Sequence, residues 1–154
     1  MKPRIELQHA NPNALQPLLA IERYLHESSL GSRLLNLIKA RASQINACAY
    51  CLDMHTQDAR VEGETEQRLH ALAAWREAPF FDERECAALA WTEAVTQVAQ
   101  SHVPDEVYET ARRHFNEKEL IDLTLAITNI NAWNRLNVAF RTPAGTYRPG
   151  MYKL

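Results

Sequence analysis

Glycine and proline are scarce in the long central stretches of this chain, which limits the folds open to it. Only 4 glycines occur in 154 residues, and glycine and proline are the residues that most strongly interrupt helices. Apolar residues recur at helical spacing, for example at Leu34, Leu37 and Ile38. No segment shows sustained alternation of apolar and polar residues bounded by turn residues, so no sheet is expected. The sequence therefore predicts an all-α bundle of about seven helices.

The expected helices follow one another with short connections. They cover residues 13–27, 29 or 31 to 45, 47–61, 65–77, 82–100, 104–115, and 116 or 117 to 140. Asn46 is predicted to cap the third of these helices, because asparagine is a preferred N-cap residue, and Gly63 is predicted to end it. Asp82 and Glu85 have the spacing of a capping box, which predicts the start of the fifth.

A single domain is expected over residues 1–154, because this length suits one hydrophobic core. The helical core should cover about 13–140. The tail, 141–154, contains two prolines and two glycines. We expect it to lie irregularly on a surface, for instance that of a neighbouring subunit.

Charge and cysteine content exclude several classes of protein. The net charge of −2 gives no general attraction to nucleic acid or to anionic membranes, and no apolar run approaches the roughly 20 residues of a membrane span. The first residues lack the apolar segment of a secretory signal. Three cysteines, an odd number, argue against the disulfide framework of a secreted protein. We expect a cytoplasmic protein.

Cys48, Cys51 and His55 are the residues most suggestive of chemistry. Spacings of three and four return to the same face of a helix, so the three side chains should lie together. Cys48 would be the second residue after the Asn46 cap, where free backbone N–H groups and the helix dipole favour a thiolate. His55 can move protons as the sulfurs react. The pattern predicts dithiol–disulfide chemistry.

Three other interpretations of the cysteines stay open. Two cysteines and a histidine could bind a metal, although a structural zinc site needs a fourth ligand that no spacing identifies. A thioredoxin fold also begins a helix with this motif, but it requires a βαβ context that is missing here. The cysteines could also be small buried residues. We expect neither a metal nor a cofactor.

The sequence around the cysteines resembles the AhpD-like alkylhydroperoxidases of the carboxymuconolactone decarboxylase superfamily. The residues that carry the resemblance are 41–55, with 58–60 and 63–64 after them, then 91–94, 119–126 and 130–135. The resemblance covers most of the chain.

The resemblance implies an all-α fold that assembles into trimers or hexamers, and the reduction of hydroperoxides. It assigns Cys51 as the cysteine that reduces the peroxide, Cys48 as the resolving cysteine and His55 as the proton-transfer group. A dithiol such as a lipoyl group or a thioredoxin-like protein would restore the thiols. The helix-start argument favours Cys48 as the more activated thiol, so the two arguments give the sulfurs different roles.

Two positions depart from the family pattern. Asn36 stands where the family has a relay glutamate, and Tyr50 stands where it has a histidine. Glu93 lies on the core-facing stripe of its helix, and a buried acid needs a partner or a function. We hypothesise that Glu93 approaches the face of Cys51 and His55 as a substitute acid. Pairing with an arginine or reaching solvent is the alternative.

Two other functions remain open for a chain with these features. The founding activity of the superfamily is lactone decarboxylation, which does not need the cysteine pair. A non-enzymatic redox sensor is the second alternative, because a fold does not fix a function.

Overall fold

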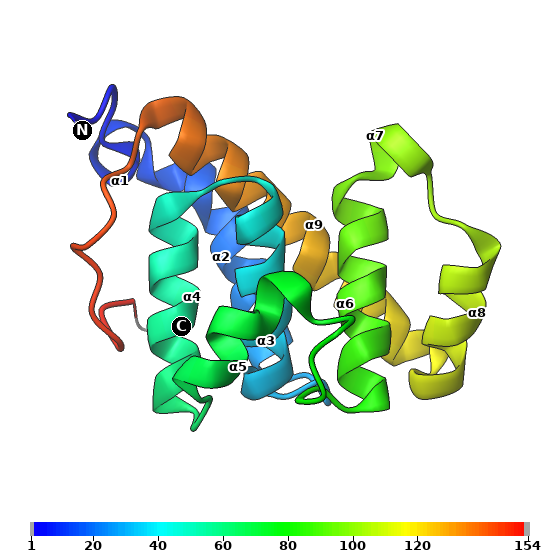
Figure 1. Ribbon diagram of the computed structural model, residues 1–154. Coiled ribbons are helices and arrows are strands. Elements are labelled where there is room, and N and C mark those ends of the chain that lie inside the picture. Colours follow the sequence, from blue (N-terminus) through cyan, green and yellow to red (C-terminus); the bar gives the residue numbers. More distant parts are fainter. Residues whose placement is uncertain (1, 153–154) are drawn as a thin grey trace.

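The computed structural model describes residues 2–152, and within them every regular element is a helix (Figure 1). The elements are α1 (Leu7–Ala10), α2 (Pro12–His26), α3 (Ser32–Ile45), α4 (Ala49–Val61), α5 (Glu66–Ala71), the 3₁₀ helix η1 (Leu72–Ala74), α6 (Glu83–Thr96), α7 (Val98–Ser101), α8 (Asp105–His114) and α9 (Glu117–Phe140). The predicted all-α class is confirmed. None of these helices is both long enough and apolar enough to cross a membrane.

The structure divides two of the expected helices. The segment expected over 65–77 is α-helical only over Glu66–Ala71 and then tightens into η1. The segment expected over 82–100 breaks at Gln97 before the short α7. The break follows β-branched Val95 and Thr96, which are poor helix formers. The Thr96 hydroxyl also accepts a hydrogen bond from Asn131 on α9.

The structure shows caps at three helix ends, and the sequence predicts two of them, at Asp82 and at Gly63. Asp82 and Glu85 form the capping box of α6, with each side chain bonded to the backbone of the other residue. Asn116 caps α9 in the same way. Gly63 follows the end of α4 with a φ of +88°, a conformation that glycine adopts without steric cost.

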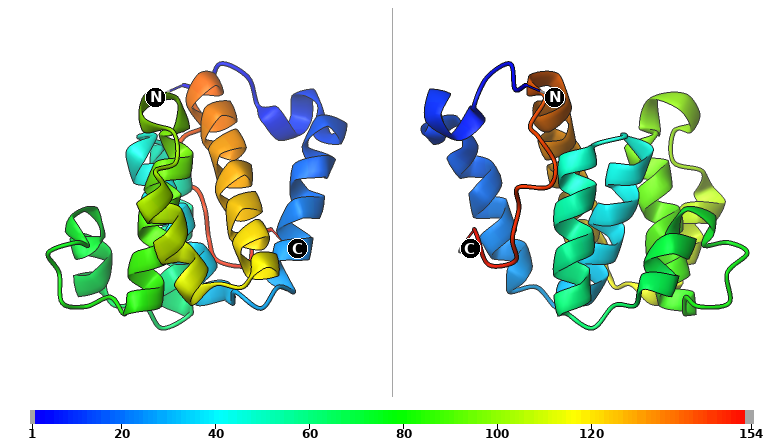
Figure 2. Two further views of the ribbon diagram at one scale, coloured as in Figure 1. Left: turned by 90° about the vertical axis from the view of Figure 1, so that its right-hand side faces the viewer. Right: turned by 60° about the vertical axis from the view of Figure 1, so that its left-hand side comes forward.

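Helix α3 lies in the middle of the bundle, between α4 on one side and α6 and α9 on the others (Figure 2). A large apolar cluster joins α2, α3, α6, α8 and α9, with Leu25, Ile38, Phe115 and Ile127 almost completely buried. Each such side chain contributes about 1.5–3 kcal/mol through removal from water. Helices α3 and α9 pack into this interior, and α4 packs against both of them through a second, smaller cluster that includes Cys48 and Cys51.

The tail folds back on its own chain. In Figure 1 it runs without helix alongside α4. The Gly145 N–H donates to Asp53 at 2.9 Å, and the Tyr147 hydroxyl donates to Asp58 at 2.6 Å. The N-terminal segment is joined to the end of α9, since the Arg4 N–H donates to the Phe140 carbonyl at 2.9 Å. Residues 141–152 contain no helix, and they form hydrogen bonds with α4 and with Asn137 of α9.

Candidate active site

The junction between α3 and α4 differs from the prediction. Asn46 does not cap α4: it follows the last residue of α3, and Ala47 after it has a φ of +52°. Cys48 is therefore the N-cap residue of α4 and not its second helical residue. Asn46 is used elsewhere, because its amide donates to Asn131 and to Asn134 of α9, both at 2.9 Å. Cys48 still lies at the helix N-terminus, where the dipole favours a negative charge.

The two sulfur atoms of the motif lie together in the interior. The Sγ atoms of Cys48 and Cys51 are 2.7 Å apart, and both residues are buried. The hydrogen bond with Cys51 lowers the pKa of Cys48 to about 7. The same bond, together with burial, raises the pKa of Cys51 well above its usual range. The two cysteines therefore titrate as a pair, and the directions of the two pKa shifts favour a thiolate on Cys48 with the remaining proton on Cys51.

Asparagines of α9 surround the sulfur pair. The Asn137 amide donates to Cys51 Sγ at 3.4 Å. Asn134 is completely buried and donates to the Ser43 hydroxyl at 3.0 Å, and its hydrogen bonding lowers the pKa of both cysteines. Asn131 and Asn134 thus form a polar interface between α9 and the end of α3. An amide N–H can stabilise a negative charge on sulfur without changing its own protonation state, so these residues provide a fixed polar environment.

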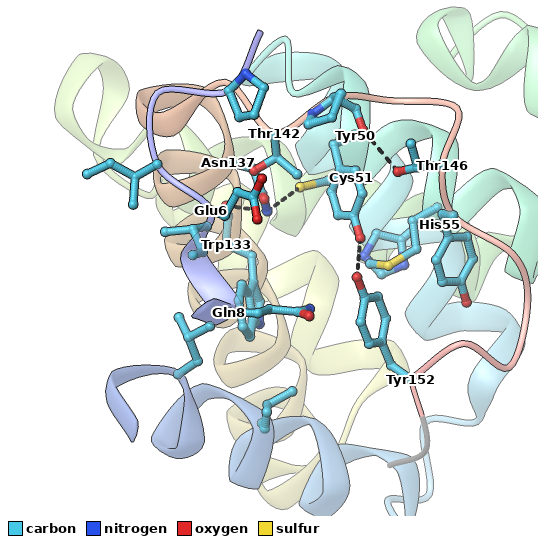
Figure 3. Close-up of a pocket in the computed structure, with 18 of the residues that line it drawn as sticks. Glu6, Gln8, Tyr50, Cys51, His55, Trp133, Asn137, Thr142, Thr146 and Tyr152 are labelled. Carbon is cyan, nitrogen blue, oxygen red and sulfur yellow. Dashed lines mark hydrogen bonds between the residues drawn. The ribbon is translucent and has the colours of Figure 1, made fainter. Parts of the chain in front are cut away.

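A cavity of about 370 Å³ lies between α2, α4, α9, the N-terminal segment and the tail (Figure 3). Its lining is mainly apolar and aromatic. Residues of α4 and α9 that reach it are Tyr50, Cys51, Met54, His55, Asp58, Trp133 and Asn137. Cys48 does not line it. Cys51 has almost no accessible surface, so a molecule in the cavity reaches its sulfur only after a small movement of the wall.

His55 lies one turn beyond Cys51 and faces the same cavity. It is buried, and burial lowers its pKa well below the usual range, with a further contribution from the nearby Lys39 ammonium. Its Nδ1 has no hydrogen-bond partner within residues 2–152. His55 is therefore a neutral imidazole at pH 7, able to accept or donate a hydrogen bond in the cavity.

A buried ion pair that was not predicted from the sequence borders the cavity. Lys39 Nζ donates to Glu22 Oε2 at 2.5 Å, and Asn129 donates to Glu22 Oε1 at 2.6 Å. Glu22 lines the cavity. The available signal was Lys39 itself, a lysine among the apolar residues of the core-facing stripe of α3.

Glu93 lies in a different cluster. Its carboxylate accepts hydrogen bonds from Arg41 at 2.9 Å, from Trp75 at 2.8 Å and from Arg76 at 2.5 Å. Burial raises the pKa of Glu93, but these donors outweigh it and the net pKa is lowered. Glu93 is not among the residues that line the cavity of Cys51 and His55. The structure thus agrees with the ion-pair alternative, and Glu93 connects α6 to α3 and to the segment after η1.

The two positions that depart from the family pattern have different surroundings. Asn36 is half-buried on α3 and does not line the cavity. Tyr50 does line it, and its hydroxyl lies 2.6 Å from that of Tyr152 in the tail. Within residues 2–152, no three His, Cys, Asp or Glu side chains are grouped so that they could hold a metal ion.

Comparisons with known proteins agree with this architecture. The model of the carboxymuconolactone decarboxylase family matches residues 12–94, which include both cysteines of the pair and His55. The chain is 41% identical to the uncharacterized protein YdfG of Bacillus subtilis (strain 168), over 95% of this chain and 99% of that protein. It is 31% identical to the uncharacterized protein YnjA of Escherichia coli (strain K12), over 71% of this chain and 59% of that protein.

Two solved structures show the same fold. One is a protein of unknown function from Agrobacterium tumefaciens that has been related to the antioxidant defence protein AhpD. It is 42% identical, with a TM-score of 0.91 over 95% of this chain and 100% of that one. The other is an uncharacterized peroxidase-related protein from Silicibacter sp. TM1040, 26% identical, with a TM-score of 0.78 over 88% of this chain and 72% of that one. The chain belongs to the carboxymuconolactone decarboxylase family and has its AhpD-like fold.

Proposed function

We propose that this protein is a thiol peroxidase that reduces hydroperoxides through a dithiol–disulfide cycle of Cys48 and Cys51. The observation that carries the proposal is the position of the sulfur pair. The two Sγ atoms are 2.7 Å apart, and Cys51 lies at the wall of a mainly apolar cavity. An apolar cavity with a few polar groups suits an organic molecule with one polar end.

The first step uses the shared proton of the pair. The Cys48 thiolate takes the proton of Cys51, and the Cys51 thiolate attacks the terminal oxygen of the hydroperoxide. An S–O bond forms, the O–O bond breaks, and the products are a sulfenic acid on Cys51 and an alkoxide that takes up a proton. Sulfur is oxidised and the hydroperoxide is reduced to an alcohol. The assignment of nucleophile to Cys51 and of base to Cys48 reconciles the helix-terminus argument with the family pattern.

The second step closes the disulfide. The Cys48 thiol attacks the sulfenic sulfur, an S–S bond forms, and the hydroxyl group leaves with the Cys48 proton as water. The cysteines need little rearrangement because their sulfur atoms already lie close together at the start of α4. His55 faces the same cavity and acts as a neutral imidazole that binds the hydroperoxide and moves protons.

A dithiol, such as a lipoyl group or a thioredoxin-like protein, then reduces the disulfide by thiol–disulfide exchange. Both sulfurs are buried, and the tail and the N-terminal segment line the cavity that Cys51 borders. Reduction therefore requires these segments to move aside or a reductant with a slender, extended end. A lipoyl arm has that shape.

The test is a count of free thiols before and after one equivalent of tert-butyl hydroperoxide, measured after denaturation. Wild type should lose two thiols. The Cys48→Ser variant should form a sulfenic acid on Cys51 that dimedone traps, and Cys51→Ser should lose none. Cys86→Ser, which alters the half-buried third cysteine, should still lose two.

Other outcomes identify the alternatives. Unchanged thiols in wild type would overturn the peroxidase and leave the lactone decarboxylase, which does not need the pair. Loss of two thiols in a single round, without turnover when a lipoyl dithiol is supplied, would indicate a redox sensor instead.

A further inference from the structure

We propose that Tyr50 protonates the leaving oxygen of the hydroperoxide, and that Tyr152 of the tail positions Tyr50 and links it to solvent. This inference rests on the proposed peroxidase function. It assigns a catalytic residue to a position where the family pattern is not followed, and a positioning residue to a tail without regular structure.

The geometry places both hydroxyls at the cavity. Tyr50 immediately precedes Cys51 in the first turn of α4, and both side chains line the cavity together with Tyr152. The two hydroxyl oxygens are 2.6 Å apart and point toward each other (Figure 3). Tyr50 is buried, whereas 37% of Tyr152 is exposed. The pair therefore connects the neighbourhood of Cys51 with solvent.

The hydroxyls of Tyr50 and Tyr152 have one more hydrogen-bond donor than the bond between them uses. Two hydroxyls carry two protons, and one proton satisfies the bond between them. When Tyr152 donates to Tyr50, the proton of Tyr50 is left free for an oxygen in the cavity. Burial, followed by the hydrogen bond with Tyr152, raises the pKa of Tyr50 well above the usual range of a tyrosine. Tyr50 therefore keeps its proton until a strong base such as an alkoxide is formed beside it.

Four other acidic or basic groups in or beside the cavity, His55, Glu22, Asp58 and Cys48, are less suited to this step. His55 is neutral rather than an imidazolium at pH 7. The Glu22 carboxylate is bound by Lys39 and Asn129, and Asp58 accepts from Tyr147. The Cys48 proton is needed later, when the disulfide closes.

Contacts within the tail, and between the tail and α4, hold Tyr152 in place. The rings of Tyr147 and Tyr152 stack with their centroids 5.9 Å apart and an interplanar angle of 22°. Tyr147 is itself fixed by burial and by its bond to Asp58 on α4. Contacts of this kind order a side chain that would otherwise move freely with the tail.

The proton transfer balances with the first step of the cycle. As the O–O bond breaks, the proton of Tyr50 moves to the alkoxide oxygen and yields the alcohol. Tyr152 returns a proton to Tyr50, and solvent returns one to Tyr152. The cysteine pair begins as a Cys48 thiolate and a Cys51 thiol, so its oxidation to a disulfide consumes one proton. That proton comes from solvent through Tyr152 and Tyr50.

The test compares two oxidants that differ in the leaving group. tert-Butyl hydroperoxide releases a strongly basic alkoxide, whereas peracetic acid releases acetate, which needs no proton at neutral pH. We expect Tyr50→Phe to slow Cys51 oxidation by tert-butyl hydroperoxide about 100-fold and to change the peracetic acid rate by less than about threefold. Tyr152→Phe should slow the first reaction by about threefold to tenfold. The double variant should be no slower than Tyr50→Phe.

Tyr108→Phe, on the exposed side of α8, is the matched control and should leave both rates unchanged. Circular dichroism and thermal unfolding establish that the variants fold. Equal slowing with both oxidants, or no slowing in Tyr50→Phe, would overturn the role of Tyr50. A double variant slower than Tyr50→Phe would overturn the role of Tyr152. A wild type that reacts with neither oxidant would overturn the peroxidase itself.

Discussion

Asn137 donates its amide to Cys51 Sγ at 3.4 Å, although 86 residues separate the two along the chain. The bond lowers the pKa of Cys51, because an N–H donor stabilises a thiolate. We expect Asn137→Leu to raise the pKa of Cys51 further and to slow its oxidation by hydroperoxide about tenfold, the effect of one lost hydrogen bond. Stopped-flow kinetics measure the rate. Thr128→Ala, at an exposed position of α9, is the control, and an equal loss in both variants would contradict the assignment.

Cys48 should set the pH dependence of the thiol pair. Its pKa is lowered from 9.0 to about 7, mainly by the hydrogen bond with Cys51. The rate of Cys51 oxidation should therefore rise as pH increases through about 7 and level off above it, because Cys48 must be a thiolate to take the proton of Cys51. The same inflection should appear in thiolate absorbance near 240 nm and disappear in Cys48→Ser. An inflection near 9 in wild type would contradict the shared-proton arrangement.

His55 should make the fold sensitive to mild acid. Burial is the main cause of its lowered pKa, which lies well below 6.5 in the folded state. Below pH 6.5 the unfolded chain binds a proton at this residue and the folded chain does not. Stability is therefore complete above pH 6.5 and falls as the pH decreases, by up to about 1.4 kcal/mol per pH unit. Urea unfolding from pH 7 to pH 5 measures this slope.

The His55→Gln variant should lose this part of the slope, whereas His70→Gln, which alters an exposed side chain, should keep it. An unchanged slope in His55→Gln would assign the acid sensitivity to other groups.

The ion pair of Glu22 and Lys39 should be costly to break from one side. Both side chains are largely buried, with exposed fractions of 12% and 8%. Removal of one partner leaves an uncompensated charge, so Glu22→Gln or Lys39→Met should each lower the free energy of unfolding by about 3–5 kcal/mol. The double variant leaves no charge and should recover most of that stability. Denaturant unfolding of wild type, the two single variants and the double variant gives the coupling free energy between Glu22 and Lys39. Additive losses of stability would mean that the two side chains are not energetically linked.

Local signals predicted much of the fold. The capping box that begins with Asp82 depends on residues three apart, so a short stretch of sequence contains the whole interaction. The common face of Cys51 and His55 likewise follows from helix geometry alone. These predictions succeeded because each depends on neighbours along the chain.

The differences lie where distant residues decide the outcome. Asn46 has the preference of a helix cap, but two asparagines of α9, more than 80 residues away, use its side chain instead. Glu93 has the pattern of a buried acid, yet its partners Arg41 and Trp75 come from other segments. The position of Tyr152 beside Tyr50 depends on a tail whose path no periodicity describes. A short stretch of sequence does not show which distant polar side chains will pair with one another.

The cavity has an inner wall of helix and an outer wall formed in large part by two terminal segments, residues 3–9, which include the start of α1, and the irregular tail 142–152. Such segments tolerate substitutions and changes of length far better than a packed helical interior does. Within a lineage of related genes, the outer wall can therefore diverge to admit new molecules while the sulfur pair keeps its reactivity. Relatives with the same thiol motif and different outer walls would catalyse the same reaction on different substrates.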